Sequence, residues 1–294
     1  MKKKFCSLLI ILSLHSAGQT MIEKPKILYG VCNKDSLLIE PFNKWYSSGY
    51  DSYQPKTETI QSIKKQNTDN ISIEIFFGTW CGDSKREVPR FLKLLNSIGF
   101  PDKKVILIGL GGSDSLIKQS PQHEEAGKGI FRVPTFIVYR NGVEINRINE
   151  FPVFSLEKDL LNIFSNQPYT PNYQSFAPMK KWLTDGTFSD ENISTAGLAQ
   201  QLRPLVRSEH ELNSLGYLLL KQNKKKEALR TFQINYSLYP ESANVTSSLG
   251  EGYFETGEYQ KAVSFLERAL ELNKLTADIK GILDILYKAK AKAQ

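Results

Sequence analysis

The sequence predicts a chain with two parts, an α/β sandwich followed by an all-α helical repeat region. Residues 56–166 alternate helix-like and strand-like segments, a pattern that is typical of layered α/β domains. Residues 208–294 have helical periodicity alone, and part of their pattern recurs after 34 positions. The chain of 294 residues has room for about two domains.

Residues 1–18 have the pattern of a secretory signal peptide. A cationic start at 2–4 precedes an apolar run over 5–14 and small residues at 16–18. The run is shorter than the roughly 20 apolar residues of a transmembrane helix. We therefore expect cleavage after Gly18, export to the periplasm or out of the cell, and no stable membrane insertion. An uncleaved anchor or a buried helix is the alternative.

Charge and cysteine usage exclude some classes of function. Cleavage would lower the formal net charge from +7 to +4, with 35 Lys and Arg against 31 Asp and Glu. This mild excess is spread along the chain and does not indicate a nucleic-acid-binding protein. The mature chain would keep Cys32 and Cys81 in a compartment where disulfides persist. No residues have metal-ligand spacing, so no metal or other cofactor is expected.

Residues 19–55 form an aromatic-rich N-terminal extension. Six large aromatic rings lie between Tyr29 and Tyr53, and Pro41 and Pro55 interrupt regular structure. Rings of this size bury a large area when they pack. We expect an irregular segment that packs onto the following domain.

Hydrophobic periodicity predicts the elements of the sandwich, residues 56–166, in chain order. They are a helix over 56–66, an alternating strand over 71–77, a helix over 84–99, a short buried strand over 104–110, a hairpin over 133–148 and a helix over 155–164. The hairpin prediction depends on Asn141-Gly142, the strongest short hairpin signal. Prolines and glycines interrupt residues 167–207, so this segment is predicted to be a connector with short helices.

Small and large residues recur at a fixed spacing of 34 positions within residues 208–294. Leu215-Gly216, Ala228, Phe232 and Pro240 correspond, 34 positions later, to Leu249-Gly250, Ala262, Leu266 and Lys274. Small residues let two antiparallel helices approach closely, and larger residues fill the seam. The segment resembles the tetratricopeptide repeat family over about 210–290, with two repeats and a capping helix. The resemblance implies a protein partner on the repeats; packing against the first domain is the alternative, because two repeats offer a small concave surface.

The stretch FFGTWCGDSKREVPRF, residues 76–91, has one cysteine where a strand meets a helix. Cys81 begins a C-x-x-S motif that ends at Ser84, and Pro89 follows inside the predicted helix. Val133-Pro134-Thr135 precedes the hairpin. These motifs together resemble the thioredoxin superfamily. The resemblance implies a thioredoxin-like fold and a cis-proline loop beside the thiol. It also implies a substrate-binding rim formed by Trp80, Val133, Pro134 and Thr135.

With a single thiol at this position, the site can form a mixed disulfide but has no second cysteine in the motif to resolve it. A helix N-terminus favours the thiolate form of Cys81. Ser84 could donate a hydrogen bond to that thiolate, but it cannot resolve a mixed disulfide. We therefore expect thiol–disulfide exchange between protein substrates and a thiol from solution, isomerisation of substrate disulfides, or covalent retention of a partner. The alternative is a non-catalytic adaptor or scaffold. Cys32 is either a resolving thiol or a small buried hydrophobe.

Overall fold

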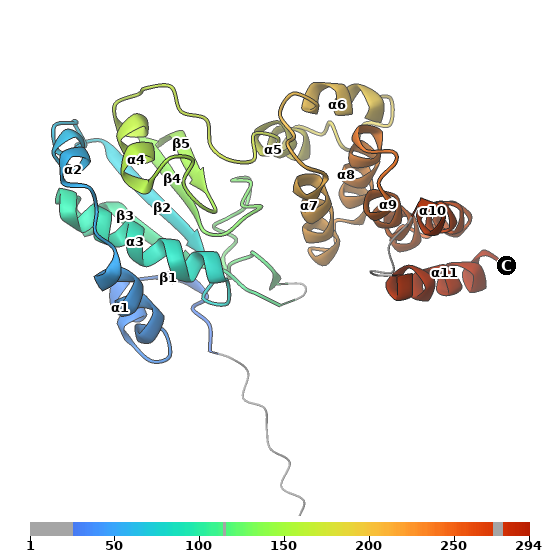
Figure 1. Ribbon diagram of the computed structural model, residues 1–294, viewed down its shortest axis with the longest axis horizontal. Helices are drawn as coiled ribbons and strands as arrows, with labels where there is room; N and C mark the ends of the chain where they lie inside the picture. The colour runs from blue at the N-terminus through green and yellow to red at the C-terminus, as the bar shows by residue number, and fades with distance from the viewer. Residues whose placement is uncertain (1–25, 114–115, 273–278) are drawn as a thin grey trace, which may run out of the picture.

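The computed structural model describes residues 26–113, 116–272 and 279–294, which form a sheet-containing sandwich and a helical part. The sandwich comprises strands β1–β5 with helices α1–α4, and the helical part comprises α5–α11. Figure 1 shows the two parts side by side, with α5 nearest to the sandwich. The predicted signal peptide and the first residues of the extension lie outside the described residues.

Five strands form one mixed sheet in the order β1-β3-β2-β4-β5. They are β1 (Gly30–Cys32), β2 (Ile71–Phe77), β3 (Val105–Gly109), β4 (Thr135–Arg140) and β5 (Val143–Asn149). Strands β2 and β3 are parallel, and the other neighbours are antiparallel. Asn141 and Gly142 have φ values of 52° and 77° and form the predicted hairpin turn. The prediction of an α/β sheet with a separate helical segment is confirmed at this level.

The two faces of the sheet carry separate cores. Helices α1 (Asn43–Ser52), α2 (Thr57–Lys64), α3 (Gly82–Ile98) and α4 (Leu156–Phe164) contribute to a large core on one face. Alternate β2 residues point into it: Ile71, Ile73, Ile75 and Phe77. Phe76 points to the opposite face, where a smaller core also contains Ile108 and Val133. The alternation follows from the two-residue period of a strand.

The N-terminal extension is more regular than the sequence predicts. Strand β1 adds an antiparallel edge to β3, and α1 packs on α3. Helix α1 is rich in Asn, Ser and Gly, which are weak helix formers, so packing stabilises it. Gly49 allows the approach, because a Cβ there would lie 2.7 Å from Cγ of Pro89. A three-residue strand such as β1 is too short for periodicity to identify.

The helical part consists of α5 (Phe176–Thr184), α6 (Thr195–Leu202), α7 (Glu209–Lys221), α8 (Lys225–Leu238), α9 (Ala243–Glu255), α10 (Tyr259–Leu272) and α11 (Ile279–Ala293). A Cβ on Gly216 would lie 2.3 Å from Cε1 of Phe232, and one on Gly250 would lie 2.8 Å from Cγ of Leu266. In each pair a glycine thus faces a large residue, and the second pair follows the first by 34 positions. Helices α7–α11 enclose one hydrophobic core, and the short helices α5 and α6 contribute residues such as Trp182 and Leu202 to it. Among the described helices, none is long and apolar enough to cross a membrane.

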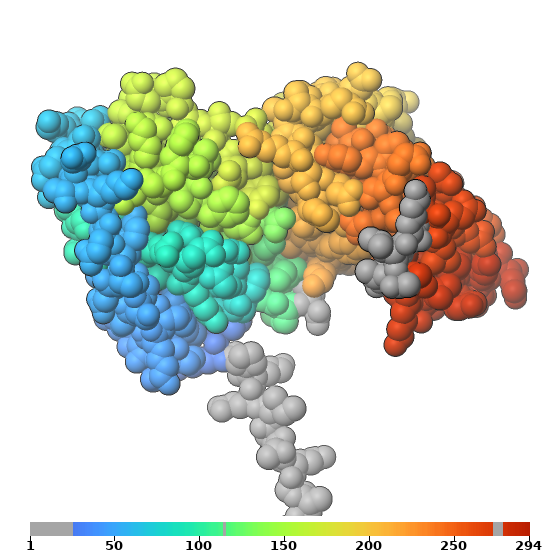
Figure 2. Space-filling model, in the orientation of Figure 1, coloured from blue at the N-terminus to red at the C-terminus, as the bar shows by residue number. Residues whose placement is uncertain are grey.

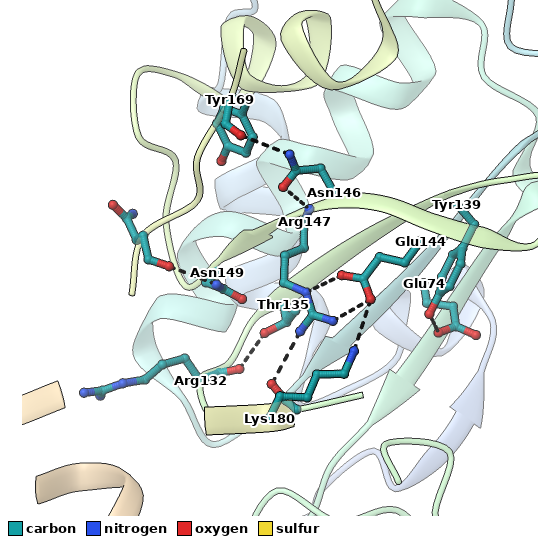
Figure 3. Close-up of polar contacts among 12 residues, drawn as sticks. Glu74, Arg132, Thr135, Tyr139, Glu144, Asn146, Arg147, Asn149, Tyr169 and Lys180 are labelled. Carbon is teal, nitrogen blue, oxygen red and sulfur yellow. Dashed lines mark hydrogen bonds and ion pairs between the residues drawn. The ribbon is translucent and has the colours of Figure 1, made fainter. Parts of the chain in front are cut away.

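Polar contacts connect β5 to the connector and to α5 (Figure 3). Glu144 accepts hydrogen bonds from Nε and Nη2 of Arg147 at 2.6 and 2.8 Å and lies 3.5 Å from Nζ of Lys180. Burial acts to raise the pKa of Glu144, but Arg147 and Lys180 outweigh it and hold the pKa below its usual value. Asn146 donates to the carbonyl of Tyr169 at 3.1 Å. These contacts link the edge strand of the sheet to the helical part.

Apolar contacts also join the two parts at the segment before β4. Ile117 and Phe131 pack against the core of the helical part. The rings of Phe131 and Phe176 are T-shaped, with centroids 5.1 Å apart. Nε2 of Gln222, after α7, donates to the carbonyl of Ile117 at 3.2 Å. Figure 2 shows the two parts in contact on the face that it draws.

Candidate functional site

Cys81 is the N-cap residue of α3. Its backbone is extended, with φ −90° and ψ 129°, and its N–H donates to the carbonyl of Gly78 at 2.9 Å. The half-buried thiol donates to the carbonyl oxygen of Val133 at 3.4 Å. The first N–H groups of a helix lack intrahelical acceptors and attract negative charge. A thiolate formed at Cys81 would therefore face the positive end of α3.

The loop before β4 holds the partner of that thiol. The Val133–Pro134 peptide bond is cis, the isomer that the resemblance implies. Thr135 donates its hydroxyl to the carbonyl of Arg132 at 2.7 Å. The side chains of Val133, Pro134 and Thr135 are buried. The loop thus presents the Val133 carbonyl to the thiol, and the binding of a substrate at these residues stays a prediction.

Trp80 is the one partly exposed member of the predicted rim. Its indole Nε1 donates to the carbonyl of Leu110 at 3.0 Å. Gly78 and Gly112 lie against the ring, because a Cβ on either would be 2.5 or 2.4 Å from an indole carbon. The two glycines thus allow the indole to lie flat beside Cys81.

Ser84 lies fully buried in the first turn of α3. Its hydroxyl accepts a hydrogen bond from the N–H of Gly78 at 3.1 Å. The expected hydrogen bond between Ser84 and Cys81 is not among the contacts of the described residues, where the protonated thiol points to Val133 instead. A contact with the thiolate stays a prediction. The hydroxyl connects the end of β2 to the start of α3 and so stabilises the loop that carries the thiol.

A cavity of about 510 Å³ opens beside Cys81, and we call it the thiol cavity. Its walls come from both parts of the chain. The sandwich contributes Trp80, Cys81, Asp83, Ile117, Lys118, Arg132, Val133 and Glu150, and the helical part contributes Ser214, Tyr217, Leu218 and Lys221. The last four residues lie on one face of α7, since they are separated by three, four and seven positions. Helix α7 therefore forms the wall opposite the thiol.

Three cationic and two acidic side chains line the thiol cavity. Nη2 of Arg132 donates to Oγ of Ser214 at 2.8 Å, and Nη1 lies 3.6 Å from Glu150. Figure 3 shows the Arg132 side chain pointing away from the β5 contacts. Nζ of Lys118 donates to the carbonyl of Phe131 at 2.8 Å. Burial, with a contribution from Arg132, lowers the pKa of Lys118 to about 8.

Cys32 lies on the opposite face of the sheet from Cys81. It pairs with Leu107 of β3, and both contact the large core. Cys81 packs against the small core, and both cysteines are free thiols. Burial raises the pKa of Cys32 to about 11, and a backbone hydrogen bond with Gly109 opposes the rise. The structure thus does not bring the possible resolving thiol to the site.

Several residues of the thiol cavity were not identified from the sequence. Lys118 lies in a segment without periodicity, and Glu150 directly follows the hairpin. Arg132 precedes Val133, so its proximity to the proline loop was a usable signal. The face of α7 is amphipathic, but spacing does not reveal which surface a helix covers. Among the described residues, no group of three or more His, Cys, Asp or Glu side chains could hold a metal ion.

Comparisons with known proteins add no family to these observations. No protein-family model matches the chain, and no curated protein matches it. The chemistry of the site therefore has to be inferred from its own geometry.

Proposed function

We propose that this protein is an exported, thioredoxin-like monothiol protein that exchanges disulfides through Cys81. The placement of the Cys81 thiol carries the proposal. The half-buried thiol lies at the N-cap of α3 and borders a cavity of about 510 Å³. It donates a hydrogen bond to the carbonyl of the residue before cis-Pro134. A helix N-terminus favours the anionic sulfur that such chemistry needs. The signal-like pattern of residues 1–18 supports export.

Several features of the sandwich support the thioredoxin-like assignment. The chain passes from the buried strand β2 through Cys81 into α3, which contains Pro89. A cis-proline precedes β4, which forms a hairpin with β5. The central strands β3, β2 and β4 are flanked on one face by α1–α4.

The packing of α7–α10 supports the tetratricopeptide assignment of the helical part. Gly216 faces Phe232, and Gly250 faces Leu266 in the same manner 34 positions later. One face of α7 lines the thiol cavity. We propose that α7 selects substrates at the thiol. A protein partner of the repeats would then bind to α8–α11.

The C-x-x-S motif determines how the reaction ends. The Cys81 thiolate attacks a disulfide, forms a mixed disulfide and releases the other half as a thiolate. A hydroxyl at position 84 cannot displace the bound half. A thiol from solution therefore attacks the mixed disulfide and regenerates Cys81, while the substrate leaves as a new disulfide. Protein thiols and disulfides that can enter the cavity are the proposed substrates.

Mass spectrometry after treatment with a limiting small disulfide tests the proposal. The wild type should accumulate a mixed disulfide at Cys81, and Cys81→Ser should form none. Cys32→Ser is the matched control and should behave as the wild type. Ser84→Cys restores a C-x-x-C motif and should form a bond between positions 81 and 84 instead of the mixed disulfide. A folded wild type that forms no adduct would refute the proposed exchange activity.

A non-catalytic scaffold is the second candidate function. The observation that favours it is the covering of the thiol by α7, with Ser214, Tyr217 and Leu218 on the opposite wall. A wall that excludes disulfides would leave Cys81 as a structural residue. The same experiment separates the two candidates, since a scaffold predicts no adduct in the native state and alkylation of Cys81 only after unfolding.

A further inference from the structure

Lys118 lines the thiol cavity together with Cys81. Its half-buried side chain donates to the carbonyl of Phe131 at 2.8 Å. An ammonium group has three N–H donors. Among the contacts of the described residues, the hydrogen bond to Phe131 uses one of the three N–H donors of Lys118. The remaining two are available to a group inside the cavity.

One short segment positions both the amine and the thiol. The carbonyl of Phe131 accepts from Nζ of Lys118, and the carbonyl of Val133 accepts from Sγ of Cys81 at 3.4 Å. These carbonyls are two residues apart in the chain. Thr135 stabilises the segment by donating to the carbonyl between them, at Arg132. The segment therefore holds a proton-carrying nitrogen and the reactive sulfur at the same cavity.

The electrostatic surroundings make the proton of Lys118 transferable. The pKa of Lys118 is lowered to about 8. Burial is the largest cause, and the positive charges of Arg132 and Lys221 also contribute to the lowering. Glu150 and the Cys81 sulfur act in the opposite direction. An amine that titrates near the working pH can both donate and accept a proton. An ordinary lysine, with a pKa of 10.5, would hold its proton too tightly for the second role.

We propose that Lys118 is the proton donor and acceptor for disulfide exchange at Cys81. The inference rests on the proposed function and adds a residue to it. Neutral Lys118 takes the thiol proton and leaves an ammonium–thiolate pair. Sγ of Cys81 then bonds to one sulfur of the substrate, and the S–S electron pair departs on the other sulfur. Lys118 returns the proton to that leaving thiolate.

The second half of the reaction uses the same group in reverse. Neutral Lys118 takes the proton of an incoming solution thiol, whose sulfur bonds to the substrate sulfur of the mixed disulfide. The electron pair of the broken bond returns to Cys81, and the Lys118 ammonium gives its proton back to this thiolate. A substrate disulfide leaves, and no further oxidant or reductant is consumed. The amine therefore has the same protonation state before and after each half-reaction.

Two neutral disulfides with different leaving groups test the role of Lys118. The leaving half of 2-hydroxyethyl disulfide is a basic alkyl thiolate that needs a proton, whereas dithiodipyridine releases a resonance-stabilised thiolate whose sulfur needs none. Lys118→Met should slow exchange with the alkyl disulfide at pH 7 by at least about tenfold, a modest general-acid effect. Exchange with dithiodipyridine should slow by much less. Equal slowing of both reactions would indicate a structural effect and overturn the inference.

Two further variants refine the test. Lys118→Arg keeps a positive charge but cannot release its proton near neutral pH. It should retain alkylation of Cys81 at pH 7 while showing the same selective loss with the alkyl disulfide. Lys64→Met removes an exposed lysine of α2 and should match the wild type with both disulfides. Full alkyl-disulfide activity in Lys118→Arg would show that charge alone suffices and would contradict proton transfer.

A measurement on the native fold covers the case in which Lys118 variants do not fold. Competitive amine labelling against pH reports the titration of Lys118 in the wild type and in Cys81→Ser. Titration near pH 8 should move to lower pH when Cys81 is removed, because coupled groups shift each other. An unchanged titration would overturn the inference. A wild type that labels as expected but exchanges neither disulfide would refute the proposed function instead.

Discussion

The two cysteines of the described chain differ in environment and should differ in reactivity. Burial raises the pKa of Cys32 to about 11, which leaves about one thousandth of it as thiolate at pH 8. Cys81 lies at a helix N-terminus and borders the thiol cavity. Iodoacetamide at pH 8 should therefore modify Cys81 in the native protein and leave Cys32 free. Peptide mapping checks this, with labelling in denaturant as the control; equal native rates would contradict the prediction.

Lys118 should make stability depend on pH in a defined window. Its pKa of about 8 in the folded protein lies below the ordinary 10.5, so the unfolded chain binds more protons between these values. The free energy of unfolding should then rise with pH, by about 1 kcal/mol from pH 8 to pH 9. Above pH 9 the raised pKa of Cys32 acts in the opposite direction. Urea titrations should show the rise in the wild type and no rise in Lys118→Met.

Only part of the site could be predicted at the level of residues. Cys81, Ser84 and Trp80 lie in one contiguous motif, so a strand followed by a helix was enough to bring them together. Lys118 and Lys221 reach the same cavity from segments that are about 100 positions apart. Local sequence patterns do not predict that these two lysines lie at one cavity, because this depends on how the folded sandwich packs against the folded helical part.

At the level of elements, the helix seams of the repeats should tolerate added volume differently. Gly216→Ala would place a Cβ 2.3 Å from the rigid ring of Phe232, whereas Gly250→Ala would meet the movable Leu266 side chain at 2.8 Å. Overpacking costs about 1–3 kcal/mol, and the helix propensity of alanine returns up to about 1 kcal/mol. Gly216→Ala should therefore lower the free energy of unfolding by about 2 kcal/mol, and Gly250→Ala by less than half of that.

Thermal and urea unfolding of both variants measure the difference. Gly197→Ala in α6 is the control, because its Cβ would meet only Cβ of Ser194 at 3.7 Å, an ordinary contact. It should leave stability unchanged or raise it by up to about 1 kcal/mol. A Gly216→Ala variant as stable as the control would show that the seam between α7 and α8 is looser than described.

Elements with strong local signals were predictable, and elements held by packing were not. Residues 71–77 alternate β-branched residues, and Asn141-Gly142 suits a tight turn, so both hairpin and central strand follow from the chain itself. Helix α1 contains Asn, Ser and Gly and forms because Tyr46 is buried and Gly49 contacts Pro89. Tertiary contacts of this kind override propensity. Because sequence periodicity does not reveal such contacts, the extension was expected to be irregular.

At the level of the whole molecule, the contact between the two parts should make unfolding cooperative. Phe131 packs on Phe176 and on the core of the helical part, so Phe131→Ala should weaken the coupling. In a Trp182→Phe background, tryptophan fluorescence reports the sandwich, and far-UV circular dichroism reports mainly the helices. The two transitions should coincide before Phe131→Ala is introduced and separate after it.

A control variant distinguishes coupling from general destabilisation. Tyr287→Ala removes a side chain of α11 that is 67% exposed, and it should leave both transitions coincident. Separate transitions in the Trp182→Phe background alone would mean that the two parts unfold independently. The thiol cavity would then lose its α7 wall under any condition that unfolds the helical part first.

The sheet that separates Cys32 from Cys81 also determines the kinetic order of oxidation. Each sulfur faces a different core, so no bridge within one molecule can form while the sheet is intact. In the native fold, a disulfide between two copies of the chain requires that two molecules meet at the half-buried Cys81 thiol. Dilution would therefore protect the thiol, and crowding would accelerate its loss to covalent dimers.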